Sequence, residues 1–264
     1  AGQQFSGLTS LPPLAALGAL DDLEVVYEAG RLTAAEARSV GVDWVYAPVA
    51  DLSVEPDNPI VGTRSFGPHP LAVARQVTAW IFGCRAGGAL SCVKHFPGHG
   101  RTTTDSHLAL PTVRAPKRSL AQDLAPFAAA VEAGVPTVMT AHVAYPALDA
   151  SGVPATLSSR ILGDLLRRQL GFDGLVVSDA MNMGGVADAA GGRVAGIRAV
   201  AAGVDALLHP DDPEALAVAL DEATRGALAP ARRADALRRV ALAADRAAAL
   251  VPGEAAGARA WAAD

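Results

Sequence analysis

The sequence predicts an α/β fold built on a parallel sheet, and two observations support this. Short apolar runs alternate along the 264 residues with segments whose apolar side chains recur at helical spacing. This alternation is typical of β/α units, in which each helix connects two parallel strands. The length is close to the ~250 residues of a β/α barrel. No low-complexity linker divides the chain, so we expect one domain over residues 1–264.

The first half contains three predicted helix–strand pairs. A helix over 21–40 stops at Gly41, and the apolar run at 44–52 follows as a strand. A helix over 71–85 ends at a glycine pair and leads into a strand at 89–96. The next helix is expected to begin at Ser119, where Gln122 is placed for a capping box, and to end at Gly134. Its strand is predicted at 136–142.

The second half continues the pattern. A helix over 159–170 precedes a strand at 171–180, and a glycine-interrupted helix over 185–203 precedes a strand at 204–210. Helices at about 213–225 and 230–250 follow, and the Ala- and Gly-rich tail beyond Pro252 is expected to fray. The predicted sheet therefore has five strands.

Composition excludes several classes of function. The net charge is −5 with no basic stripe, so nucleic acid is not an expected partner. Cys84 and Cys92 are too few for a disulfide framework. No apolar run reaches the ~18 residues of a membrane span, and the first residues do not resemble a secretion signal. We expect a cytoplasmic protein, although a leader removed upstream of residue 1 would not be seen.

Each predicted strand ends in a polar residue at its carboxyl side. These residues are, in order, Asp51, Lys94 with His95, His142, Asp179 and His209. Single polar strand ends are often structural, but the carboxyl ends of parallel strands meet at one rim. In β/α barrels that rim holds the active site. The set therefore predicts a (β/α)8 barrel-type fold with a site at this rim.

Two segments carry acid–base chemistry. Asp179 in LVVSDAM could act as a nucleophile, a base or a metal ligand, or it could cap the helix that follows. Asp105 stands two residues before His107, so its carboxylate could orient the imidazole and raise its basicity. This acid/base interpretation competes with a simple surface turn.

Cationic side chains complete the predicted site. Buried lysines are rare unless paired, so Lys94 is expected to reach into a cleft and bind hydroxyl or carboxylate groups. Arg64, in GTRSFG, is a second cation on a loop. Zinc would compete for His95, His99, His107 and Asp105, but their spacing matches no HExxH-type pattern. No metal or other cofactor is predicted.

Taken together, KHFPGHG with DSH, APVADL with GTRSFG, MTAH, and GFDGLVVSDAM resemble glycoside hydrolase family 3. The DSH loop resembles that of the bacterial β-N-acetylglucosaminidase branch, which removes N-acetylglucosamine from cell-wall muropeptides and related glycosides. The resemblance runs from about Gly7 to about Pro210.

The resemblance implies a retaining exo-β-N-acetylglucosaminidase. It assigns Asp179 as the nucleophile that forms a covalent glycosyl-enzyme, His107 with Asp105 as the acid/base pair, and Arg64, Lys94 and His95 as sugar-binding residues. A β-glucosidase or β-xylosidase, an N-acetylglucosaminide phosphorylase, and a non-catalytic sugar-binding or interaction module stay open as alternatives.

One feature of the family is missing from this sequence. Relatives carry an Asp-x-Glu-Gly-Gly motif at the end of a strand just before the segment that matches AGQQFSGLTSLP, and this chain starts inside that motif. The five predicted strands are fewer than the eight of a closed barrel. We therefore expect a barrel that lacks its N-terminal strands. The chain would be a fragment, be completed by a missing segment or second chain, or form a divergent half-open protein.

Overall fold

A computed structural model describes residues 6–106, 109–186 and 191–252. Its five strands form one parallel sheet in the order β1-β2-β3-β4-β5. They are β1 (Trp44–Val45), β2 (Leu90–Phe96), β3 (Thr137–Thr140), β4 (Leu175–Ala180) and β5 (Ala206–Leu208). The predicted α/β class and parallel sheet are confirmed. The described residues form a half-barrel, and a closed (β/α)8 barrel is not seen among them.

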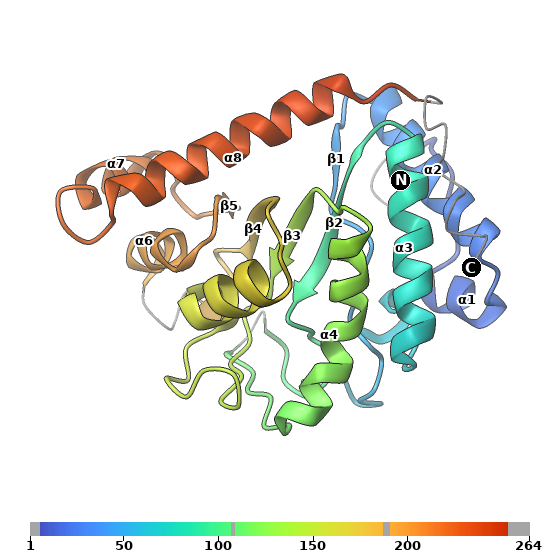
Figure 1. The fold of residues 1–264 in the computed structure, drawn as a ribbon, viewed down its shortest axis with the longest axis horizontal. Coiled ribbons are helices and arrows are strands. Elements are labelled where there is room, and N and C mark those ends of the chain that lie inside the picture. Colours follow the sequence, from blue (N-terminus) through green and yellow to red (C-terminus); the bar gives the residue numbers. More distant parts are fainter. Residues whose placement is uncertain (1–5, 107–108, 187–190, 253–264) are drawn as a thin grey trace.

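Helices flank this sheet (Figure 1). They are α1 (Leu14–Leu20), α2 (Leu23–Ser39), α3 (Pro70–Ala86), α4 (Lys117–Glu132), η3 (Arg160–Gln169, wound as a π-helix), α6 (Gly192–Ala202), α7 (Pro213–Ala223) and α8 (Pro230–Ala249). Two short 3-10 turns, η1 (Gly62–Arg64) and η2 (Ala155–Leu157), lie in loops. In the described part of the chain no helix is long and apolar enough to cross a bilayer.

The helices α2 and α3 pack backbone to backbone. A Cβ added at Gly30 would lie 2.4 Å from the carbonyl oxygen of Trp80, and one at Gly83 would lie 2.0 Å from that of Tyr27. Both distances are far inside van der Waals contact, so only glycine permits this approach. It places the first two long helices as one layer beside β2.

Ion pairs hold the amino ends of β4 and β5, at the end of the sheet opposite the predicted site. The buried carboxylate of Asp205, just before β5, pairs with Arg167 at 2.8 Å and with Arg232 of α8. Arg239, also on α8, bonds Asp173 just before β4. Helix α8 therefore crosses the amino ends of the strands, on the side away from their carboxyl ends (Figure 1).

Several sequence predictions need correction. The first strand is only two residues long because Pro48 has no N–H to donate to a ladder; beyond it a single bridge joins Val49 to Lys94. The capping box is wrong, since α4 starts at Lys117 with Pro116 at its N-cap. Helix α1 was not predicted. Residues 187–190 of the predicted 185–203 helix and the tail from residue 253 lie outside the described residues.

Candidate active site

The carboxyl ends of β2 and β4 bring His95 and Asp179 together. Nε2 of His95 lies 3.9 Å from Oδ2 of Asp179, and Nδ1 of the same ring lies 2.6 Å from Oδ2 of Asp51. Asp51 is fully buried and His95 nearly so, whereas the Asp179 side chain is 19% exposed. Three predicted strand-end residues thus form one chain of contacts that ends at an accessible carboxylate.

The carboxylate of Asp51 is completely engaged. Besides the imidazole, it accepts the backbone N–H of His95 at 3.1 Å and that of His99 at 2.6 Å through Oδ1. Burial alone would raise its pKa, but the charge and hydrogen bond of His95, together with the His99 contacts, hold the pKa below its ordinary value. Asp51 is therefore ionised and binds the loop that follows β2.

Asp179 is also kept ionised. Burial opposes this, but nearby His95 and His142, the N–H of Ala180 at 2.9 Å and Lys94 together lower its pKa. An ionised carboxylate that is partly open to solvent, at a strand end, can act as a nucleophile or base.

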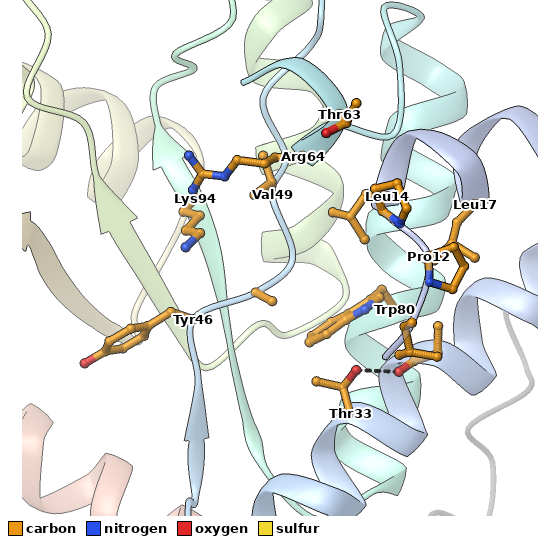
Figure 2. A pocket seen from close by; sticks show the side chains of 14 residues that line it. Pro12, Leu14, Leu17, Thr33, Tyr46, Val49, Thr63, Arg64, Trp80 and Lys94 are labelled. Atoms are coloured by element: carbon orange, nitrogen blue, oxygen red, sulfur yellow. Dashed lines mark hydrogen bonds between the residues drawn. The ribbon is translucent and has the colours of Figure 1, made fainter. Parts of the chain in front are cut away.

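A cavity of about 380 Å³ is lined by Lys94, the residue before His95, and by Arg64, but not by Asp51, His95 or Asp179. Figure 2 shows Arg64 extending toward Lys94 at one end, with Trp80 and Leu14 on the opposite wall. Burial, and then the charge of Arg64, lower the pKa of Lys94. The cavity thus combines two hydrogen-bond-donating cations with an apolar wall, which suits a ligand with hydroxyl groups and an apolar face.

Two other strand-end histidines have different surroundings. His142 is fully buried, with Nδ1 2.7 Å from the Thr156 hydroxyl and Nε2 3.0 Å from the Ala180 carbonyl oxygen, and burial lowers its pKa. Because a carbonyl only accepts, Nε2 carries the proton. Through this hydrogen bond His142 holds the end of β4. His209, in contrast, is exposed.

The loop after β2 has anchors that sequence reasoning missed. His99 contacts Thr102 at 2.8 Å and Ser106 at 3.1 Å, and the carbonyl oxygen of Ser106 accepts the N–H of Gly185 at 3.0 Å. Ser106 lies between Asp105 and His107 in the predicted acid/base motif. Asp105 is described and partly buried, but His107 lies outside the described residues. The geometry of their pair is therefore not tested.

An ion pair between a partly exposed arginine and a buried aspartate holds the start of this loop. Nε of Arg101 lies 2.6 Å from Oδ2 of Asp123 on α4, and the other carboxylate oxygen is buried without a hydrogen bond. No sequence pattern predicts this pair, because the two residues are 22 positions apart. Among the described residues, no group of three His, Cys, Asp or Glu side chains could hold a metal ion.

The fold and the site define a protein of the β/α-barrel type with a carboxylate-centred site at the carboxyl ends of its strands. Residues 1–243 match the family model described as "Glycosyl hydrolase family 3 N terminal domain", and the chain belongs to this family. It is 42% identical over 221 residues to a β-hexosaminidase of Thiobacillus denitrificans, which covers 80% of this chain.

Solved structures agree with this assignment. A glycoside hydrolase family 3 β-N-acetylglucosaminidase from Paenibacillus superposes with a TM-score of 0.90 at 39% identity over 92% of this chain. A β-glucoside phosphorylase, BglX, superposes with a TM-score of 0.88 at 26% identity over 97% of it. The chain spans 60% of the Thiobacillus protein, 47% of the Paenibacillus structure and 50% of the phosphorylase.

Proposed function

We propose that this chain carries the active site of a retaining exo-β-N-acetylglucosaminidase. The observation that carries the proposal is the ionised, partly exposed carboxylate of Asp179 at the end of β4, beside His95 and within the electrostatic influence of Lys94. The names of the relatives supply the substrate class, a β-linked N-acetylhexosamine. Glycosides derived from cell wall are the expected source.

In the first step an oxygen of Asp179 attacks the anomeric carbon and the bond to the leaving oxygen breaks. His107 donates its proton to that oxygen, so the leaving group departs neutral and a glycosyl ester remains on Asp179. In the second step His107 takes a proton from water, the resulting oxygen attacks the anomeric carbon, and the carboxylate is released. Retention follows from the two successive inversions.

Asp105 would orient His107, and Arg64, Lys94 and His95 would bind sugar hydroxyls. Support for the loop role comes from Ser106, which bonds His99 and Gly185 and so joins the β2 loop to the segment after β4.

The uncovered edge of the sheet at β1 supports a further proposal, that other strands complete the barrel. Trp44 and Tyr46 are only half-buried around Cys92, Met139 and Val177, on an inner surface that a closed barrel would cover. We propose that additional strands, from a longer form of this chain or from a second chain, complete the barrel beside β1. The cytoplasmic location stays a prediction.

The experiment is hydrolysis of an aryl β-N-acetylglucosaminide, measured beside a solution mass. Asp179→Ala should abolish turnover, while Asp245→Ala, an exposed carboxylate on α8, serves as the matched control and should retain it. Equal activity of the Asp179 variant and wild type would refute the mechanism. Saccharide binding without turnover by the wild type would instead favour a non-catalytic sugar-binding module.

Phosphate as the acceptor is a second candidate, favoured by the structural likeness to a protein named as a β-glucoside phosphorylase. A His–Asp pair also places less negative charge near an incoming anion than a lone glutamate would. Formation of sugar 1-phosphate in phosphate buffer would establish this reaction, and release of free sugar alone would exclude it.

A further inference from the structure

We propose that Asp51 is a positioning residue that fixes a proton on Nδ1 of His95 and so directs Nε2 toward Asp179 and bound sugar. The consequence for turnover rests on the proposed function, but the position of the proton does not. Nothing in the sequence pattern separates Asp51 from the other strand-end residues. The inference comes from its contacts.

The first step concerns the proton on the ring. An ionised carboxylate can only accept hydrogen bonds. The 2.6 Å contact between Oδ2 of Asp51 and Nδ1 of His95 therefore requires the proton on Nδ1. The other oxygen is occupied by two backbone N–H groups, so the carboxylate cannot turn away without losing them.

The second step concerns the opposite edge of the ring. Nε2 lies 3.9 Å from Oδ2 of Asp179, which is too long for a hydrogen bond. Because Asp51 occupies Nδ1, Nε2 is the ring nitrogen that remains for a contact with Asp179 or with a sugar hydroxyl.

His142 provides a contrast within the same site. Its Nε2 donates to the Ala180 carbonyl oxygen at 3.0 Å, so its fixed proton is on the other ring nitrogen. Two buried imidazoles beside Asp179 thus have a proton fixed on different nitrogens by different partners, a carboxylate for His95 and a carbonyl for His142. The choice of partner, and not burial as such, sets which nitrogen carries that proton.

Asp51 also joins the other sugar-binding segments. Its carbonyl oxygen accepts the Ser65 hydroxyl at 2.6 Å, and Ser65 directly follows Arg64. The preceding N–H, of Ala50, donates to the Lys94 carbonyl oxygen at 2.7 Å. One residue therefore sets the position of the Arg64 turn by its backbone and of His95 by its side chain.

The test is Asp51→Asn, which keeps the shape and the oxygen that accepts both N–H groups. Its amide nitrogen would donate to Nδ1 and drive the proton to Nε2. Imidazole ¹⁵N shifts should show His95 as Nδ1–H in the wild type and Nε2–H in Asp51→Asn, with the signal identified by its loss in His95→Gln. Asp149→Asn, another buried aspartate, is the control and should leave His95 unchanged.

Turnover gives the second readout. We expect kcat/KM to fall by between ~10²- and ~10⁴-fold in Asp51→Asn. The precedent is the aspartate-to-asparagine change in the Ser-His-Asp triad, which leaves the geometry intact but yields the wrong histidine tautomer and lowers kcat about 10⁴-fold. A tautomer switch with unchanged turnover would overturn the catalytic role.

The spectrum needs no activity, so it separates this inference from the proposed function. A wild-type His95 without a proton on Nδ1, or unchanged ring protonation in folded Asp51→Asn, would overturn the inference. Should Asp51→Asn not fold, the wild-type spectrum decides by itself.

Discussion

Nε2 of His95 lies 3.9 Å from Oδ2 of Asp179 although β3 separates their strands. Neighbouring strands are about 4.8 Å apart, so backbones two strands apart are separated by about 9–10 Å in a flat sheet. Both side chains must therefore extend toward each other across the end of β3. This convergence places an imidazole between two carboxylates, Asp51 and Asp179.

The contact predicts the pH dependence of the proposed reaction. Burial raises the pKa of Asp179, and His95 is the largest influence that lowers it. Removing the imidazole with His95→Gln should therefore raise this pKa and move the acidic limb of the kcat/KM profile to higher pH. The shift of the acidic limb is measured from the pH dependence of kcat/KM for an aryl glycoside, in the wild type and in His95→Gln. An acidic limb at the same or lower pH would show that His95 does not control the ionisation of Asp179.

Stability should depend on pH through His99. Burial, and then the charge of His95, lower its pKa from 6.5 to about 4 in the folded protein. Between pH 6.5 and pH 4 the imidazole binds a proton in the unfolded chain but not in the folded one. The contribution of His99 to folding stability is therefore fully present above pH 6.5 and is lost as the pH falls toward 4. At about 1.4 kcal/mol per pKa unit the loss reaches about 3 kcal/mol.

Urea unfolding at several pH values between 4 and 7.5 measures this loss. In His99→Gln the slope of the free energy of unfolding against pH should be shallower, although His142, whose pKa is also lowered by burial, preserves part of it. His69→Gln, at an exposed position, is the control and should keep the wild-type slope. Identical slopes in all three proteins would contradict the assignment.

The ion pair of Arg101 and Asp123 should behave as a unit. Arg101→Met leaves a buried carboxylate without its cation, which should cost about 3 kcal/mol in the free energy of unfolding. Adding Asp123→Asn removes the uncompensated charge, so the double variant should be more stable than Arg101→Met alone. Denaturant unfolding of the single and double variants measures the coupling, and strictly additive losses would argue against it.

Gly100 is expected to tolerate no side chain. A Cβ there would lie 1.7 Å from the carbonyl oxygen of Leu52, a backbone atom that cannot rotate away. Gly100→Ala should lower the free energy of unfolding by about 3 kcal/mol. Gly163→Ala is the matched control, because that position is helical and has open space, and it should raise stability by up to about 1 kcal/mol. Thermal or urea unfolding compares the two.

The acid/base proposal for His107 has its own test. His107→Ala removes protonation of the leaving group, so glycosides with poor leaving groups should lose far more kcat/KM than those with activated phenols. General acid–base catalysis typically contributes ~10²- to ~10⁴-fold, which bounds the difference. A uniform loss across leaving groups would show that another residue supplies the proton.

Residue pattern alone was enough for the class of fold and for the candidate residues. Apolar runs that alternate with helical segments predict β/α units because side-chain periodicity is a local property, and all five predicted strands are present in order. Motifs such as KHFPGHG and LVVSDAM likewise indicated the family, because their residue types stand close together in the chain.

Tertiary structure decided which of these residues act on one another. Asp51 and His95 are 44 positions apart, and Arg101 and Asp123 are 22 apart, so their pairing depends on how strands and loops meet in space. The sequence also could not distinguish the roles of His95 and His142, since both are histidines at the ends of predicted strands. Their partners, a carboxylate in the loop after β1 and a carbonyl oxygen at the end of β4, come from distant parts of the chain, and no local pattern encodes such long-range contacts.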